Sequence, residues 1–128
     1  MHTARLTAVV ASLALATACG TSGGGGGVNP GEVVAVDSGG VQTATIDGTD
    51  RLRFSPGTVK AKPGPIELTL KVTGGVPHDL KVKGIAGAEI PNVGGHESKT
   101  LKFTATAGTY QLICTYHSGM RGSLVVAP

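Results

Sequence analysis

Four side chains of the kinds that bind soft metal ions lie in two segments of the chain. Cys114, His117 and Met120 are spaced three residues apart near the C-terminus, and His78 precedes them. A thiolate and a thioether favour Cu(I), and imidazole nitrogens bind copper in either oxidation state. One Cys, two His and a weak axial Met form the ligand set of a mononuclear copper site that transfers electrons. The sequence therefore predicts a site for one copper ion that cycles between Cu(I) and Cu(II).

Each of these residues also has a simpler explanation. Zinc accepts cysteine and histidine ligands, but methionine is not among its usual ligands, and a zinc enzyme needs an open coordination position. Taken singly, Cys114 is explained as an inert core thiol, Met120 as a gap-filling side chain and His78 as a hydrogen-bonded core histidine. His117, taken alone, is explained as a surface residue. A further histidine, His96, is explained as an exposed turn residue. The four ligand types at this spacing favour the copper site.

Apolar and polar residues alternate through much of the remaining sequence. Ile66–Val72 alternates without a fault, which is the pattern of a strand with one buried face. Further strands are expected over Glu32–Val36, Val41–Ile46, Leu52–Phe54, Thr58–Lys60, Leu80–Lys83, Thr100–Ala105 and Ser123–Val126. No stretch has a convincing helical period.

Turn-forming residues separate these strands. The predicted turns include Ser38–Gly40, Asp47-Gly48, Ser55–Gly57, Lys62–Pro65, Gly74-Gly75, Pro91-Asn92 and Gly94-Gly95. Short strands with turns at this spacing indicate an all-β sandwich of about seven to eight strands. The predicted domain covers residues 32–128.

The alternation of side chains along a strand places two of the candidate ligands. Successive side chains point to opposite faces of a sheet. His78 shares its face with Leu80 and Val82, and Cys114 shares its face with Leu112. We therefore expect His78 and Cys114 to point into the core.

The N-terminus has the features of an export signal. Arg5 supplies a positive charge, and residues 6–18 form an apolar run of small residues that ends at Cys19. The run is shorter than the roughly 20 residues that a membrane-spanning helix needs. Residues 16–20 resemble the lipobox of bacterial lipoproteins, which implies a lipoprotein-type signal peptide over residues 1–18 and a lipid on Cys19. Ordinary cleavage after Ala18 with Cys19 unmodified is the alternative.

Residues 19–31 are rich in glycine and have no periodicity, so they are expected to form a flexible tether. Exported proteins usually pair their cysteines, but this chain has only Cys19 and Cys114. If Cys19 carries lipid, Cys114 has no disulfide partner; a disulfide between the two would tie the tether to the domain. We expect the domain to be lipid-anchored at the extracytoplasmic face of a bacterial membrane, at the cell surface or in the periplasm.

Composition limits the classes of function. The chain has 128 residues, a formal net charge of +3 and 3% aromatic residues. Few aromatics and no run of basic residues argue against nucleic-acid binding. Copper enzymes such as multicopper oxidases need further copper ligands and a second domain, and this length accommodates one domain. We therefore expect no enzymatic activity.

The spacing His78 followed by Cys114-x-x-His117-x-x-Met120 resembles the cupredoxin family, the type 1 blue copper proteins that include plastocyanin and amicyanin. The two residues between His117 and Met120 match the short ligand loop of amicyanin. Supporting matches are Phe54–Lys60, Pro63-Gly64 and Gly108–Tyr110. The resemblance covers about residues 52–126 and implies a Greek-key β-sandwich with one copper ion at one end.

The resemblance also implies a role for the residue after the first histidine ligand. The family commonly has asparagine there, where it braces the ligand loop, and this chain has Asp79. Its backbone amide is expected to bond the Cys114 sulfur. Its carboxylate either accepts a hydrogen bond from the hydroxyl of Thr115 or points to solvent between Lys81 and Lys83. A buried carboxylate would favour Cu(II) and lower the reduction potential.

In the family, the second histidine ligand lies in an apolar surface patch and its ring edge is the port for electrons. Here the expected port is His117, and the expected docking surface around it is rimmed by Val76, Pro77, Pro91 and Met120. A small apolar patch suits short-lived docking. The expected partners are a redox protein donor and acceptor that dock transiently on a monomer.

The resulting prediction is a mononuclear type 1 copper protein that shuttles single electrons between redox partners at the outer face of the membrane. The alternative is an extracytoplasmic copper-binding protein for copper storage or delivery. Such proteins usually expose clusters of Met or His, whereas this chain has two methionines, one of which is the initiator.

Overall fold

A computed structural model describes residues 31–128, which form eleven strands. The strands are β1 (Glu32–Val34), β2 (Val36–Ser38), β3 (Val41–Thr49), β4 (Arg53–Ser55), β5 (Thr58–Ala61), β6 (Gly64–Val72), β7 (His78–Val82), β8 (Glu89–Val93), β9 (Ser98–Ala105), β10 (Gly108–Ile113) and β11 (Arg121–Val126). No helix capable of crossing a membrane occurs within these residues. The predicted signal peptide, Cys19 and all but the last residue of the predicted tether lie outside the described residues.

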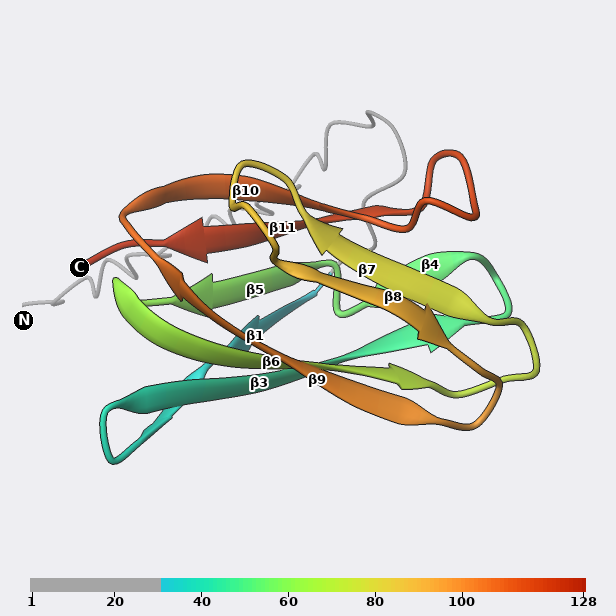
Figure 1. Cartoon of the computed structure of the whole chain (residues 1–128), viewed down its shortest axis with the longest axis horizontal. Helices are drawn as coiled ribbons and strands as arrows, with labels where there is room; N and C mark the ends of the chain where they lie inside the picture. Colours follow the sequence, from blue (N-terminus) through green and yellow to red (C-terminus); the bar gives the residue numbers. More distant parts are fainter. Residues whose placement is uncertain (1–30) are drawn as a thin grey trace, which may run out of the picture.

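The strands form two sheets that pack face to face (Figure 1). One sheet has six strands in the order β1-β5-β11-β10-β7-β8, and the other has the order β2-β3-β6-β9 with β4 paired to β3. Ile66, Leu68, Leu70 and Val72 on β6 are at most 1% exposed, because alternation turns every second residue toward the other sheet. The all-β sandwich predicted from this pattern is confirmed.

The number of strands exceeds the predicted seven to eight because one predicted strand divides and because β8 and β10 add to the strands whose ranges are predicted above. The predicted strand Glu32–Val36 divides into β1, which pairs with β5, and β2, which pairs with β3 in the other sheet. The prediction of a turn at Pro91-Asn92 is wrong, since both residues lie in β8. β8 is an edge strand with a register irregularity opposite His78–Leu80, so the ladder tolerates a residue without an N–H.

The prediction of a turn at Asp47-Gly48 is also wrong. β3 continues to Thr49 and pairs with β6 on one side and with β4 on the other. The chain turns only after Thr49, where the backbone N–H of Leu52 donates to the Thr49 carbonyl at 2.9 Å and Leu52 has a φ of 57°. Gly48 therefore lies inside a strand, where it packs against the ring of His78.

Four loops gather at one end of the sandwich, at the right of Figure 1. They are the β3–β4 turn, the β6–β7 loop (73–77), the β8–β9 loop (94–97) and the β10–β11 loop (114–120). Because β7 begins at this end and β10 runs antiparallel to it, the start of β7 lies beside the end of β10. The sheet pairing therefore brings His78 and Cys114 together from distant parts of the sequence.

Candidate metal centre

Three of the four predicted ligands converge at this end of the sandwich. One ring nitrogen each of His78 and His117 and the Sγ atom of Cys114 all lie within 4.8 Å of one another. The Cys114 sulfur lies 3.5 Å from Nδ1 of His117 and 3.9 Å from Nδ1 of His78. The two imidazole rings meet edge to face, with their centroids 5.0 Å apart. One thiol and two imidazole nitrogens thus face a common point.

The fourth predicted ligand is buried at the end of the same loop. Met120 is 1% exposed and belongs to the hydrophobic core together with Cys114. The N–H of Met120 donates to the carbonyl of His117 at 3.2 Å, and the N–H of Cys114 donates to the carbonyl of Met120 at 3.1 Å. These bonds close the short loop on itself. A weak thioether donor therefore accompanies the three stronger ones.

The ring of His78 is held in the tautomer that a metal ligand needs. His78 is fully buried, and its Nε2 lies 3.0 Å from the carbonyl oxygen of Thr49. A carbonyl only accepts, so Nε2 carries the proton and Nδ1 keeps its lone pair for a metal. Burial, and then the neighbouring charge of His117, lower the pKa of His78 below its ordinary value. The imidazole is therefore neutral at neutral pH, as metal binding requires.

Gly48 makes room for that ring. A Cβ atom at position 48 would lie 2.8 Å from Cδ2 of His78, which is closer than real Cβ contacts. The glycine read as a turn residue from the sequence is instead a strand residue against which the His78 imidazole packs.

The thiol of Cys114 is protonated until a metal replaces its proton. Cys114 is 5% exposed, and burial raises the pKa of its thiol. Hydrogen bonds from the backbone amides of Asp79 and Tyr116 act in the opposite direction, because they favour the thiolate. Cys114 is the one cysteine among residues 31–128, and it is unpaired there.

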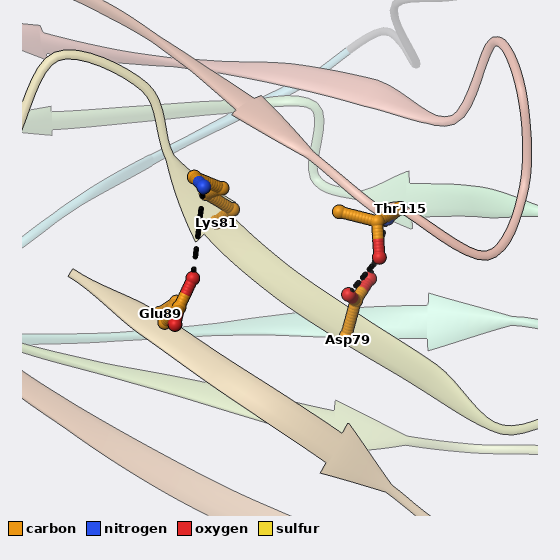
Figure 2. Close-up of polar contacts among 4 residues, drawn as sticks. All are labelled: Asp79, Lys81, Glu89 and Thr115. Carbon is orange, nitrogen blue, oxygen red and sulfur yellow. Dashed lines mark hydrogen bonds and ion pairs between the residues drawn. The ribbon is translucent and has the colours of Figure 1, made fainter. Parts of the chain in front are cut away.

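The carboxylate of Asp79 points to Thr115 and not to solvent (Figure 2). One oxygen accepts the backbone N–H of Thr115 at 2.6 Å, and the other accepts its hydroxyl in a short bond. Lys81 instead lies 3.7 Å from Glu89 on the neighbouring strand, as Figure 2 also shows. Of the two arrangements considered for Asp79, the structure has the one that braces the ligand loop.

The donor set fits copper. A buried thiol, two imidazoles and a thioether combine soft and borderline donors, which suit both oxidation states of that metal. The sequence model of the cupredoxin-like domain matches residues 8–126. The chain belongs to the cupredoxin-like domain family.

Solved structures with the same fold include three copper proteins. Auracyanin A, a blue copper protein from Chloroflexus aurantiacus, is 26% identical at a TM-score of 0.60, covering 69% of this chain and 100% of its own. A reduced Cu(I) form of an amicyanin variant is 26% identical at a TM-score of 0.53, covering 72% and 86%. The metal-binding domain of the Streptococcus pneumoniae Cu(I)-exporting ATPase CopA is 22% identical at a TM-score of 0.66, covering 77% and 97%. The comparison with curated proteins finds no match.

Two contacts of this cupredoxin's ligand loops were not anticipated from the sequence. The hydroxyl of Tyr116 donates to the carbonyl of Pro91 at 2.7 Å, and its ring packs edge-on against His117 with centroids 6.4 Å apart. The carboxylate of Asp50 accepts the backbone N–H of Val76 at 3.0 Å and that of Gly75 at 3.4 Å. The first contact ties the β10–β11 loop to β8, and the second fixes the loop that leads into His78.

Of the five residues expected at the docking surface, four are at least partly exposed and one is not. His117 and Val76 are half-buried, and Pro77 and Pro91 are exposed. The expectation that Met120 forms part of the rim is wrong, because its side chain lies in the core. His96 is exposed in the β8–β9 loop. A docking role for this surface stays a prediction.

Proposed function

We propose that this cupredoxin is a mononuclear type 1 copper protein that carries single electrons between redox partners. The observation that supports this most is the convergence of two imidazole nitrogens and one thiol within 4.8 Å, at one end of the sandwich. His78, Cys114 and His117 would hold the ion strongly, and Met120 would bind it weakly. When bound, copper supplies a one-electron couple between Cu(I) and Cu(II).

The protein's contribution is to hold the ligands still. His78 is held by Thr49 and Gly48, and the loop of Cys114 by Asp79 and by its own backbone bonds. Side chains packed in this way change little when the charge of the site changes. A small rearrangement gives fast electron transfer, which suits a carrier.

His117 is the proposed route for the electron. It is the one half-buried residue among the three that converge. Two exposed prolines lie on nearby elements, Pro77 in the β6–β7 loop and Pro91 in β8. An apolar rim lets a partner approach without strong binding, which suits a donor and an acceptor that dock in turn on a monomer. The proposed location is the extracytoplasmic face of a bacterial membrane, with Cys19 as the lipid anchor. Mass spectrometry of the mature N-terminus tests that anchor: an unmodified Cys19 would contradict it.

A redox titration of the copper-loaded protein separates electron transfer from copper storage or delivery. We expect one reducing equivalent per copper to bleach the visible band and one oxidising equivalent to restore it, with no metal released to a chelator. Loss of copper on oxidation, or binding of Cu(I) alone, would instead favour storage or delivery.

A further inference from the structure

All three arginines of residues 31–128 lie at the end of the sandwich that carries the metal centre. Arg51 lies in the β3–β4 turn, Arg53 begins β4, and Arg121 begins β11 directly after the ligand loop. Their side chains are exposed. Figure 1 shows the β3–β4 turn, the start of β11 and the ligand loop at this same end.

The backbone around these arginines is joined to the metal ligands. Arg53 is the register partner of Thr49, whose carbonyl accepts the hydrogen bond from His78. Arg121 is the register partner of Ile113, the residue before Cys114. These arginines therefore place positive charge at the end of the sandwich that holds the metal centre.

The arginines are not used in ion pairs of the described part of the chain. The ion pairs found there join Lys60 to Glu32, Lys81 to Glu89 and Lys102 to Glu67, all between neighbouring strands. Three of the lysines thus pair with glutamates on neighbouring strands, and within residues 31–128 no ion pair involves an arginine.

Two of the arginines line an open cleft of 740 Å³ together with Thr49, Ser55 and Thr73. The carboxylate in its lining belongs to Asp50, whose oxygens accept the backbone N–H groups of Gly75 and Val76. Asp50 is therefore turned toward the β6–β7 loop rather than paired with Arg51 or Arg53. Arg51 and Arg53 therefore supply the cleft with cationic hydrogen-bond donors, which suit carboxylate groups.

We propose that this cleft docks an acidic redox protein whose surface carboxylates enter between Arg51 and Arg53. The proposal rests on the electron-transfer function proposed above and names the chemistry of the partner. Guanidinium groups bind carboxylates through two parallel hydrogen bonds, and exposed charges raise the rate of encounter. In the docked complex, a bound copper ion would supply one electron to the oxidised partner, with no bond broken and no proton moved.

The test compares two double variants that each remove two positive charges. Arg51→Gln/Arg53→Gln alters the cleft, and Lys62→Gln/Lys83→Gln alters the opposite end, where both lysines are exposed and outside the ion pairs described. Stopped-flow oxidation of the Cu(I) protein by hexacyanoferrate(III), a small anionic oxidant, is measured at low ionic strength. We expect the arginine variant to react about three- to tenfold more slowly, the lysine variant nearly as fast as the parent, and the difference to vanish at high salt. Equal rates in the two variants would overturn the proposal.

A second measurement does not depend on electron transfer. Amide chemical shifts of the reduced, copper-loaded protein are followed during titration with a hexaglutamate peptide. We expect shifts in residues 49–55 and 73–76 that are lost in the arginine variant. Shifts confined to the lysine-bearing strands, or binding to anionic lipid vesicles but not to the peptide, would overturn the assignment to an acidic protein. If the parent protein shows no copper band, the proposed function fails, and the same titration of the purified protein still decides the docking surface.

Discussion

The carboxylate of Asp79 accepts both the backbone N–H and the hydroxyl of Thr115. The two residues are 36 positions apart, so this contact joins the start of β7 to the loop that carries the other ligands. Both partners of the carboxylate are donors, which is the arrangement that an ionised carboxylate requires. A negative charge that is 7% exposed therefore lies one residue from His78.

Replacing this charge is expected to change the reduction potential of the centre. Asp79→Asn keeps the shape of the side chain and removes the charge that favours Cu(II), so the potential should rise. One charge at an effective dielectric constant of about 20–40 gives a shift on the order of 50–100 mV. Protein-film voltammetry measures it. Glu89→Gln removes the same charge from the exposed surface of β8 and should leave the potential within about 20 mV; equal shifts in both variants would refute a specific role for Asp79.

Gly48 is expected to control the affinity of the site. In Gly48→Ala the new methyl group meets the His78 ring at 2.8 Å, so the ring or β3 must move. Overpacking of this kind costs about 1–3 kcal/mol, which corresponds to a loss of Cu(I) affinity of about fivefold to 150-fold. Competition with a Cu(I) chelator measures it. Gly75→Ala, whose methyl group would meet nothing within 4 Å, serves as the control, and a parental affinity in Gly48→Ala would contradict the packing argument.

The stability of the copper-free protein is expected to fall as the solution is acidified. The pKa of His78 is lowered in the fold from its ordinary value of 6.5, so below that pH the unfolded chain binds more protons. The free energy of unfolding therefore decreases as pH falls from about 6.5, with a slope of up to about 1.4 kcal/mol per pH unit from this residue. Urea denaturation between pH 7.5 and 5.5 measures the slope. The slope should be smaller in His78→Gln and unchanged in His96→Gln. An unchanged slope in His78→Gln would show that another group is responsible.

Tyr116 is expected to slow the release of copper. Tyr116→Phe removes the hydrogen bond to Pro91 and loosens the ligand loop at a cost of about 0.5–1 kcal/mol. We expect copper to leave to a chelator about twofold to fivefold faster. Tyr110→Phe is a matched control, because Tyr110 donates to the carbonyl of Thr106 at 2.9 Å away from the ligand loop. Identical release from both variants would mean that the Tyr116 contact does not restrain the loop.

The alternation of side chains predicted the parts of the site that lie on strands. His78 and Cys114 were expected to point inward because they share faces with apolar residues, and both are buried. The loop spacing placed His117 beside them but did not show that Met120 is covered. The exposure of a loop residue depends on how the loop folds back on itself. Here two backbone hydrogen bonds close the loop, and backbone bonds of this kind cannot be predicted from the side chains.

The supporting contacts were harder to predict for a related reason. Thr49 acts through its carbonyl, which every residue type possesses, so its identity carries no signal. Gly48 was read as part of a turn, because glycine serves both turns and close packing. Pro91 resembles a turn residue because proline is common in turns, although an edge strand with an irregular register accommodates it. The roles of Thr49 and Gly48 can be interpreted only once their neighbour in the other sheet, His78, is known.

The most direct test of the copper site is the visible absorption spectrum of the protein after addition of one equivalent of Cu(II), compared with that of Cys114→Ser. The account predicts an intense thiolate-to-copper charge-transfer band that is absent from the variant, because the band requires the Cys114 sulfur on the metal. Absence of the band from the parent, or its presence in Cys114→Ser, would show that the four residues do not form a type 1 copper site.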